Sequence, residues 1–511
     1  MSQPLSVLAI LLVCLTTLTL GALGLRLAKG TSDFYVAGRT VTPWRNASAI
    51  GGEYLSAASY LGVAGLVYDR GVDMLWMPVG YTVGYLVLLI LVAAPLRRSG
   101  AYTLPDFAET RLESAALRRG CALLVVGIGW LYLLPQMQGA GLALRHVSGA
   151  PTWVGACVLT VIVTLNVVAG GMRSVTLVQS VQYWIKLSAI AVPAFVLLAV
   201  WHRSGAPAPQ ADTSWWEPLT GDAPGRTLFT TYSTLAALCL GTMGLPHIVV
   251  RFYTNPDGVA ARRTTVSVLA LLSLFYLFPP IYGFLGRAYL DPSEISDDPS
   301  RTVVLALPGA MLPGLDGQLL TALAAGGAFA AFLATASGVT MSVAGAIDQD
   351  VLRPLAARVT HGDASPSASF RIAAATGVLA PFVVAITVAF FIVLMWAVRE
   401  DRKAGTAGPI VTRTLNAAFS GAGMANLAIV IVFGFGARRD QDFAVWLYYP
   451  SMIFALQSAA WFVAWNLKKK GWMLATSLGG WATAVALGLL VRESVTYLYV
   501  CTAALFLLAG V

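Results

Sequence analysis

The sequence predicts an all-α, polytopic membrane protein with about 13–14 transmembrane helices. Of the 511 residues, 57% are hydrophobic and 11% are charged, whereas soluble domains carry about 25% charge. The mean hydropathy is +0.74, and apolar runs near the roughly 20 residues that span a bilayer recur along the whole chain. A soluble fold of this length would not cover so much apolar surface, so lipid is the expected solvent.

Hydropathy places the expected spans in order along the chain. They cover residues 5–27, 46–68, 74–96, 120–144, 152–170, 175–201, 227–250, 265–287, 317–345, 371–398, 416–436, 446–466, 471–491 and 495–511. The first run has no basic segment before it, and Arg26 and Lys29 follow it. We therefore expect a retained helix there, not a cleaved signal peptide.

Basic residues gather in alternate loops up to about residue 371. The arginines of these loops are Arg39, Arg45, Arg97, Arg98, Arg111, Arg118, Arg119, Arg251, Arg262, Arg263, Arg353, Arg358 and Arg371. The other loops are short or acidic, as in "DPSEISDDPS" from Asp291 to Ser300. The positive-inside rule then predicts a multi-pass protein of the cell membrane with its N-terminus outside. The alternation fails at 398–413 and at 468–470, which are basic where outside loops are expected.

Composition and motif spacing argue against several classes of function. The net charge of +9 lies mainly in the loops between spans, so it does not indicate nucleic-acid binding. The five cysteines are scattered without metal or redox spacing. Within the spans, we find no cluster of His, Glu and Asp residues with the spacing of a catalytic site. We expect neither a transition metal, nor a cofactor, nor an enzyme.

The stretch "SAIGGEYLSAASYLGVAG", Ser48 to Gly65, is unusually polar for a membrane span. Its glycines and serines lower helix propensity and allow the backbone to leave the helix. Unwound backbone inside a membrane is tolerated where it lines a cavity, and its free carbonyls can bind a cation. Close helix packing is the alternative explanation. Glu53 favours a functional role, because intramembrane carboxylates are costly and usually functional.

Two further spans carry polar groups. The span 330–350 carries four hydroxyl groups, those of Thr335, Ser337, Thr340 and Ser342. We expect them either to complete an oxygen cage for a hard cation or to bond the carbonyls of the preceding helical turn. In 131–141, Pro135 is expected to break the helix. Gln136 and Gln138 bring amides there, which suit either a carboxylate substrate or bonds between helices.

A second broken span is expected at 241–254, where Gly244 and Pro246 interrupt an apolar run. The broken spans 46–68 and 227–250 are five spans apart, which is the spacing that a five-plus-five inverted repeat requires. His247 follows the break, and we interpret it as a capping or packing residue in preference to a proton carrier.

Four stretches in order resemble the sodium/solute symporter family. "SDFYVAGRTVTPWRNASAIGGEYLSAASYLGVAGLVYDRG" looks like its first core helix, and "GGMRSVTLVQSVQYWIK" is similar to the signature before its fifth. Gln179 and "GTMGLPHIVVRFYTNPDGVAARR" resemble the cation/acetate branch. The resemblance covers about residues 30–385. It does not extend past about 388, and a divergent, fused or artificial C-terminal third is our hypothesis for that part.

The resemblance implies a LeuT-like fold. It would comprise an extra N-terminal helix in 1–30, a first repeat in 45–202, a second repeat in 227–436 and additional C-terminal helices in 446–511. It also implies a sodium site made by the carbonyls of Gly52, Leu55 and Ala331 and by the hydroxyl of Thr335. Ala334 stands where many members have a second hydroxyl, and Glu53 is a candidate to supply charge.

By analogy, the substrate would lie beside six residues, which are Ser56, Ser59, Tyr60, Gln136, Thr242 and Gly244. The family implies symport of a small monocarboxylate such as acetate with Na⁺ by alternating access. Proton coupling, another solute, and a non-transporting membrane sensor remain alternatives. The oligomeric state is left open.

Overall fold

The computed structural model describes residues 3–25, 31–218, 224–290, 299–352, 449–469 and 471–489. Within these ranges all regular structure is helical. The chain divides into two compact units, Met1–Thr387 and Val388–Val511. The expected spans 371–398, 416–436 and 495–511 lie outside the described residues.

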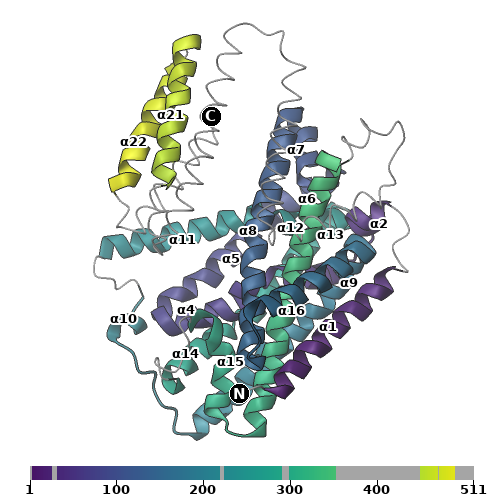
Figure 1. Cartoon of the computed structure of the whole chain (residues 1–511), viewed down its shortest axis with the longest axis vertical. Coiled ribbons are helices and arrows are strands. Elements are labelled where there is room, and N and C mark those ends of the chain that lie inside the picture. Colours follow the sequence, from purple (N-terminus) through teal and green to yellow (C-terminus); the bar gives the residue numbers. More distant parts are fainter. Residues whose placement is uncertain are drawn as a thin grey trace. The chain divides into compact units, whose positions relative to one another are not determined.

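The helical elements of the first unit follow the expected spans closely. They are α1 (Pro4–Leu25), α2 (Thr31–Val36), η1 (Ala37–Arg39), α3 (Pro43–Tyr54), η2 (Ala58–Gly62), α4 (Val63–Arg70), η3 (Gly71–Leu75), α5 (Trp76–Val87), η4 (Leu88–Val92), α6 (Ala93–Arg98), α7 (Leu104–Leu112), α8 (Ala115–Ser148), α9 (Thr152–Arg203), α10 (Thr213–Trp216), α11 (Pro224–Gly244), α12 (Pro246–Val249), η5 (Val250–Thr254), α13 (Gly258–Phe275), α14 (Pro279–Tyr289), α15 (Pro299–Met311), α16 (Leu315–Ile347) and η6 (Asp348–Leu352) (Figure 1). In the described residues, six helices are long and apolar enough to span a membrane, or seven if one bent pair counts as a span. The expected multi-pass membrane architecture is confirmed.

Two of the three predicted helix breaks are present. Helix α3 ends at Tyr54, and Leu55 leaves the helical region with φ −70° and ψ 79°. The chain resumes a helical path at the π-helix η2. Helix α11 ends at Gly244, Leu245 is extended, and α12 begins at Pro246. The axes on the two sides of this second break differ by 48°.

One expected break is absent, and one helix is unexpected. The break expected at Pro135 is wrong, because α8 continues through this residue from Ala115 to Ser148. Proline removes only one hydrogen bond from a long helix, and membrane helices tolerate that loss when neighbouring groups compensate. Helix α15 is not among the expected spans, because its 13 residues are too few to cross a membrane. It packs against α4 and α16, and its Val304 and Leu307 are buried.

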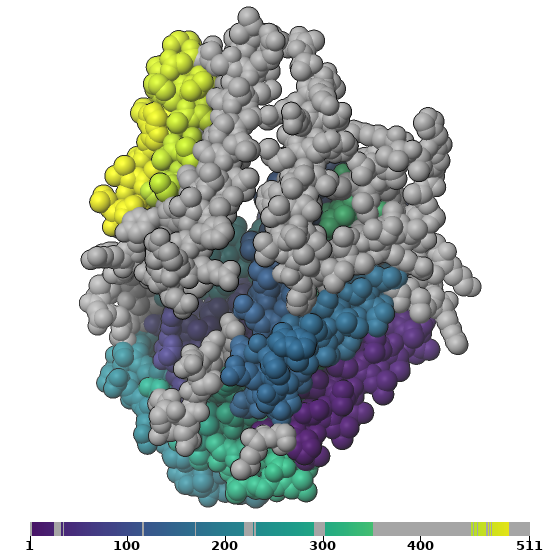
Figure 2. All heavy atoms as spheres, viewed as in Figure 1, coloured from purple at the N-terminus to yellow at the C-terminus, as the bar shows by residue number. Residues whose placement is uncertain are grey.

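Helix α9 contains two of the expected spans. Gly171 has φ 56° and ψ −152°, a conformation that favours glycine, and it marks a kink between the two parts of this helix. The spans expected at 152–170 and 175–201 are therefore the parts of α9 before and after Gly171. Helix α1 lies along α9 on the face shown in Figure 2, where the Gln182 amide donates to the Thr17 hydroxyl at 2.9 Å.

Helix α16 forms the centre of the first unit. It packs against α1, α3, α8, α9 and α15, and 83% of its most apolar window is buried. Alanine and glycine dominate the stretch from 322 to 338, and small residues of this kind let helices approach closely. Gly338 faces the side chain of Glu53 on α3, and Gly327 faces the hydroxyl of Tyr60 on η2.

Alternate loops meet at one end of the first unit. Arg39 donates to the carbonyls of Gly100 and Ala101. Arg97 donates to the carbonyls of Asn255 and Pro256 in the same way. Two arginines of the basic loops therefore bind the backbone of other loops at this end.

A group of charges that we call the Arg118 cluster lies at the same end. It consists of the guanidinium of Arg118 on α8 and three carboxylates. These belong to Asp106 at 2.8 Å, Glu109 at 2.6 Å and Asp350 at 2.5 Å. The cluster ties α7, α8 and η6 together.

The intervening loops meet one another elsewhere. Trp215 donates from its indole to the Tyr68 carbonyl at 3.1 Å. The backbone N–H of Gln210 donates to the Arg287 carbonyl at 3.2 Å, which joins the loop after α9 to the end of α14. The loops therefore alternate between two ends, as the distribution of basic residues predicts. The assignment of the N-terminus to the outside stays a prediction.

In the second unit, the described residues form a helical hairpin. Helices α21 (Tyr449–Lys468) and α22 (Gly471–Leu489) pack against each other. The Ser477 hydroxyl donates to the Ser458 carbonyl at 2.8 Å across the pair. These helices correspond to the spans expected at 446–466 and 471–491.

Candidate functional site

The break after α3 changes the partners of several backbone groups. The Ser56 N–H turns back to the Tyr54 carbonyl at 2.7 Å, and the Ser59 N–H bonds the Ser56 carbonyl at 3.1 Å. In a continuous helix these two N–H groups would bond the carbonyls of Gly52 and Leu55. Those two carbonyls instead accept from the Lys186 ammonium, which lies 2.9 Å from the Leu55 oxygen. Lys186 comes from α9, and its side chain is fully buried.

Neighbouring helices satisfy two other groups at the break. The Thr335 hydroxyl of α16 donates to the Glu53 carbonyl at 2.6 Å. The Ala57 N–H donates to the Gln136 side-chain oxygen of α8 at 3.4 Å. Because α8, α9 and α16 each supply a partner, the break is held open by side chains whose positions three separate helices determine.

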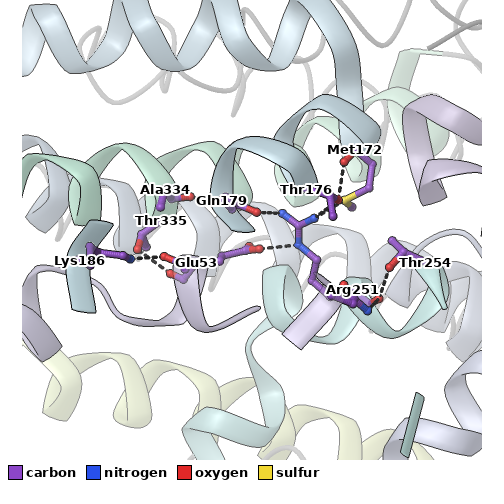
Figure 3. Close-up of polar contacts among 11 residues, drawn as sticks. Glu53, Met172, Thr176, Gln179, Lys186, Arg251, Thr254, Ala334 and Thr335 are labelled. Atoms are coloured by element: carbon purple, nitrogen blue, oxygen red, sulfur yellow. Dashed lines mark hydrogen bonds and ion pairs between the residues drawn. The ribbon is translucent and has the colours of Figure 1, made fainter. Parts of the chain in front are cut away.

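A buried ion pair lies beside the break (Figure 3). The Arg251 Nε donates to the Glu53 carboxylate at 2.6 Å, and both side chains are 0% exposed. Arg251 also donates to the Thr176 hydroxyl at 2.7 Å and to the side-chain oxygen of Gln179. The Gln179 amide in turn donates to the Ala334 carbonyl at 2.7 Å. A buried ion pair is tolerated when additional hydrogen bonds of this kind surround it.

The formal charges of this cluster do not cancel. Glu53 contributes one negative charge, while Arg251 and an ammonium at Lys186 contribute two positive charges. Counted in this way, the formal charges of the buried cluster sum to one net positive charge. Such a charge attracts an anion more strongly than it would in water.

Four of the expected substrate residues lie around the break and bond groups next to it. The Ser59 hydroxyl lies 2.9 Å from the Tyr276 hydroxyl, and the Thr242 hydroxyl lies 3.0 Å from that of Tyr54. Gln136 bonds the backbone at the break, as described above, and Ser56 bonds the Tyr132 hydroxyl.

The other two expected substrate residues have different surroundings. Tyr60 is fully buried, and its hydroxyl faces Gly327 of α16. Gly244 is exposed at the end of α11. The structure therefore brings four of the six residues to one region and gives Tyr60 and Gly244 other neighbours.

A group of tyrosines beside the break is not expected from the sequence. The rings of Tyr54 and Tyr85 are 5.0 Å apart, those of Tyr54 and Tyr81 are 5.9 Å apart, and those of Tyr81 and Tyr276 are 6.0 Å apart. Tyrosine combines an apolar ring with a hydroxyl, which suits a solute that has a short apolar body and a polar end. No spacing in the sequence indicates that these tyrosines meet.

Three of the four expected cation ligands have partners at the break. The carbonyls of Gly52 and Leu55 accept from Lys186, and the Thr335 hydroxyl donates to the Glu53 carbonyl. Ala331 is fully buried one turn before Thr335 on the same helix. Gly52, Leu55 and Thr335 of the expected set thus lie at the break, where the Gly52 and Leu55 carbonyls accept from Lys186.

Sequence reasoning missed the two cations of the site. Lys186 interrupts the apolar run "QYWIKLSAIAVPAF", and a charge within a span is a signal of function. The expectation that Arg251 lies in a cytoplasmic loop is wrong, because this residue is fully buried in η5. Counting arginines per loop does not distinguish a charge that faces water from one that turns inward to meet a carboxylate.

Comparison with known proteins settles the family. The sequence model of the sodium:solute symporter family matches residues 34–446. The chain belongs to the sodium:solute symporter family. The match continues about sixty residues past the motifs that carry the resemblance in the sequence, so residues 388–446 fall within the matched region.

Two curated relatives have names that fit this family. The uncharacterized symporter YwcA of Bacillus subtilis is 30% identical over 444 residues, which cover 84% of this chain and 80% of YwcA. A monocarboxylic acid transporter of Corynebacterium glutamicum is 30% identical over 425 residues, covering 75% of this chain and 74% of the relative.

A solved structure supports the fold of this symporter-family protein. A Na⁺-coupled sialic acid symporter, in a substrate-bound, outward-open state, aligns with a TM-score of 0.56 and 14% identity. The alignment covers 94% of this chain and 97% of the symporter. At this identity the likeness concerns the fold alone, and the expected LeuT-like architecture is confirmed. The residue bounds of the two repeats stay predictions.

Proposed function

We propose that this protein is a secondary transporter, and not an enzyme, that moves a small monocarboxylate together with a cation across the cell membrane. The observation that carries the proposal is the break after Tyr54, where a buried cluster with one net positive charge lies beside neutral hydroxyl and amide groups. A single carboxylate would balance that charge. The hydroxyls and the amide would orient it.

The chemistry of these surroundings supports the proposed solute class. The tyrosine rings of Tyr54, Tyr81 and Tyr276 offer apolar surface, and the Ser59 and Thr242 hydroxyls already bond two of them. A short acid such as acetate or pyruvate presents one charged end and one small apolar end. The name of the Corynebacterium relative, a monocarboxylic acid transporter, supports the same class.

The proposed mechanism is alternating access. The breaks at Leu55 and Leu245 allow half-helices to tilt without unfolding the rest of a span. Binding of the anion and the cation in one closed state would raise the affinity of each for the protein by the same coupling free energy. Na⁺ is the cation that the family name indicates, and its expected carbonyl ligands at Gly52 and Leu55 are bonded to Lys186 in this structure.

Counterflow in liposomes tests the proposal without any driving gradient. Purified full-length protein is reconstituted into vesicles loaded with unlabelled pyruvate and diluted into labelled pyruvate, with equal pH and equal sodium on both sides. We expect the label to accumulate transiently, and acetate and lactate to compete. Acetamide, which lacks the charge, and succinate, which has a second one, should not compete.

Variants link the exchange to the proposed site. Thr242→Val and Gln136→Leu should slow exchange, because each removes a polar group at the break. Thr82→Val is the matched control, since in the part of the chain that the structure describes this hydroxyl bonds the Pro78 carbonyl of its own helix, at 2.8 Å. Absence of monocarboxylate exchange in the unmodified protein, or equal exchange in all three variants, would contradict the proposal.

A further inference from the structure

An open groove of about 640 Å³ lies apart from the break, between the start of α3 and the first turns of α13. Its lining combines apolar side chains with two guanidinium groups. Trp44 comes from α3, while Val259, Arg262, Arg263 and Val266 come from α13. All five residues are exposed, Trp44 to 55%, Val259 to 62% and Val266 to 55%. The groove is therefore part of the outer surface of the first unit.

The groove follows one face of α13. Its four residues on this helix stand at positions i, i+3, i+4 and i+7, which is the spacing of a single helical face. The other face of α13 is buried and packs against α3, α5 and α6, and Figure 1 shows α13 beside α6. Farther along the span, Leu274 is 41% exposed. The outer side of α13 is therefore apolar toward its end and carries two arginines near its start.

The length of α3 places the groove at the level of the lipid headgroups. This helix runs for 12 residues from Pro43 to the break after Tyr54, or about 18 Å at about 1.5 Å per residue. Breaks of this kind lie near the bilayer midplane in transporters, and half of a hydrocarbon core is about 15 Å thick. The Thr264 hydroxyl donates to the Pro43 carbonyl at 3.5 Å, so the first turns of α13 lie at the level where α3 starts.

Two tryptophans indicate the same depth. The ring of Trp44 lies 6.0 Å from that of Trp184 on α9, and Trp184 is 41% exposed. Tryptophan is enriched at the boundary between membrane and water, where its ring lies among the headgroups. The aromatic pair and the length of α3 are separate observations, and both place the groove at this boundary.

The two arginines of the groove form no ion pair among the described residues. The ion pairs found there belong to Arg70, Arg118, Arg173 and Arg251. The nearby carboxylate of Asp257 accepts from the Ala260 N–H at 2.7 Å and caps α13. Arg98 adds a third guanidinium, because it lies beside Gly258 at the start of the helix. The polar end of the groove therefore has an excess of positive charge.

We propose that this groove binds an anionic phospholipid from the leaflet that the positive-inside rule assigns to the cytoplasm. Its phosphate would lie against the guanidinium groups of Arg262 and Arg263, which donate to phosphate oxygens in a fixed geometry. Its acyl chains would follow the apolar surface toward Leu274. This ligand is not the transported solute, and the site does not depend on the proposed function.

Charge and apolar surface together select this ligand. A zwitterionic lipid brings no net charge to balance the arginines, whereas an anionic lipid brings one negative charge, and basic residues near a membrane attract such lipids. Free phosphate has the charge but lacks the chains that Val266 and Leu274 would contact. A bound lipid would touch both α3 and α13, so it would hold the first half of the broken span against its neighbour.

The first experiment uses the unmodified full-length protein. It is reconstituted into phosphatidylcholine vesicles that contain a small fraction of phosphatidylglycerol with a photoreactive diazirine in an acyl chain, and the labelled peptides are identified by mass spectrometry. We expect the label to concentrate on the first turns of α13 and the start of α3. Unlabelled phosphatidylglycerol should compete, and further phosphatidylcholine should not.

Two results of this experiment would overturn the inference. Equal competition by the two lipids, or labelling spread evenly over the spans, would show ordinary contact with the bilayer. Competition by inorganic phosphate as effective as that by phosphatidylglycerol would show a site for free anions.

The second experiment compares paired substitutions. Arg262→Gln with Arg263→Gln should weaken phosphatidylglycerol binding roughly 25-fold, because each arginine near an anionic surface contributes a factor of about five. Arg262→Lys with Arg263→Lys keeps both charges and should retain most of the binding. Arg111→Gln with Arg203→Gln is the matched control, since it removes two exposed arginines elsewhere. If this control weakens binding equally, the net charge of the protein attracts the lipid and the inference is wrong.

A measurement of stability gives a separate readout. The unfolding temperature of the detergent-purified protein is compared after addition of phosphatidylglycerol or phosphatidylcholine. A ligand that binds the folded state raises this temperature, so we expect an increase with phosphatidylglycerol that the paired glutamine variant loses. No increase in the unmodified protein, or an equal increase in that variant, would contradict the inference.

Discussion

Glu53 is the residue on which the buried cluster depends. Its carboxylate balances Arg251, its backbone carbonyl accepts from Thr335, and its side chain packs on Gly338. A charge at this depth is stable only while its partner and the surrounding hydrogen bonds are present. Changes at this one residue are therefore expected to affect both stability and transport.

Glu53→Gln is expected to destabilise the protein strongly. It leaves the Arg251 guanidinium buried without its carboxylate, and breaking a buried ion pair in this way costs about 3–5 kcal/mol. The measurement is the unfolding temperature in detergent. Glu109→Gln is the control, because Glu109 is 36% exposed and Arg118 keeps Asp106 and Asp350. Equal effects of the two substitutions would show that burial does not decide the outcome.

Thr335→Val is expected to impair exchange more than it impairs folding. The substitution keeps the shape of the side chain but removes the donor to the Glu53 carbonyl. A buried acceptor without a partner costs about 1–3 kcal/mol, and here the loss falls on the break that we propose as the solute site. Thr335→Ser keeps the hydroxyl and should restore counterflow. If valine and serine behave alike, the hydroxyl has no role in holding the break.

At the residue scale, the sequence indicates Glu53, Gln136 and Thr335 because polar groups stand out in apolar runs. It does not indicate that Lys186 meets the Gly52 carbonyl, since 134 residues separate them in the chain. Long-range contacts of this kind depend on how helices pack. The tyrosines are harder still to assign, because an aromatic residue in a span is typical both of a core and of a binding site.

The helical elements are predicted more completely than the contacts between them. Glycine, serine and proline mark the breaks at Leu55 and Leu245, because these residues act locally on the backbone. Pro135 misleads for the same reason, since a long helix whose neighbours compensate absorbs one proline. Hydropathy does not indicate helix α15, because this method finds spans and α15 is shorter than a span.

Gly338→Ala tests the packing of α16 against α3. An added methyl group at Gly338 would overlap the Glu53 carboxylate, so the two helices would have to separate at the break. Gly345→Ala, on the same helix, is the control, because its nearest contact would be the Thr103 methyl group at 3.6 Å. We expect Gly338→Ala to lower the unfolding temperature and to abolish counterflow.

The control should leave both quantities close to those of the unmodified protein, because a contact at that distance is ordinary packing. Full activity in Gly338→Ala would mean that α16 and α3 separate easily, and it would weaken the case for a rigidly held break.

At the scale of the whole molecule, the alternation of loops between two ends of the first unit agrees with what the basic residues predict. Arg97 reaches the loop before α13, and Trp215 reaches the end of α4 at the other set of loops. Their assignment to the two sides of the membrane is a separate prediction that rests on charge alone. The described residues do not include 353–448, and one of the two stretches where the charge pattern fails, 398–413, lies there.

Cysteine labelling tests that assignment. Single cysteines replace Glu113 and Gly205, which are both exposed and lie in loops predicted to face opposite sides, in a background without the native cysteines. We expect a membrane-impermeant maleimide to label Gly205→Cys in intact cells, and Glu113→Cys only after the cells are permeabilised. The reverse pattern would place the N-terminus inside.

We expect the Arg118 cluster to make the two ends of the first unit respond differently to salt. One guanidinium joins three carboxylates from α7 and η6, and it is 26% exposed on the side chain. Opening the protein at this end would have to separate these charges, and dissolved ions weaken attractions between groups that water reaches. Raising the ionic strength on the face that carries this cluster should therefore speed its opening. The same change on the opposite face should have little effect. The rate of opening would therefore depend on the salt concentration on one side of the membrane only.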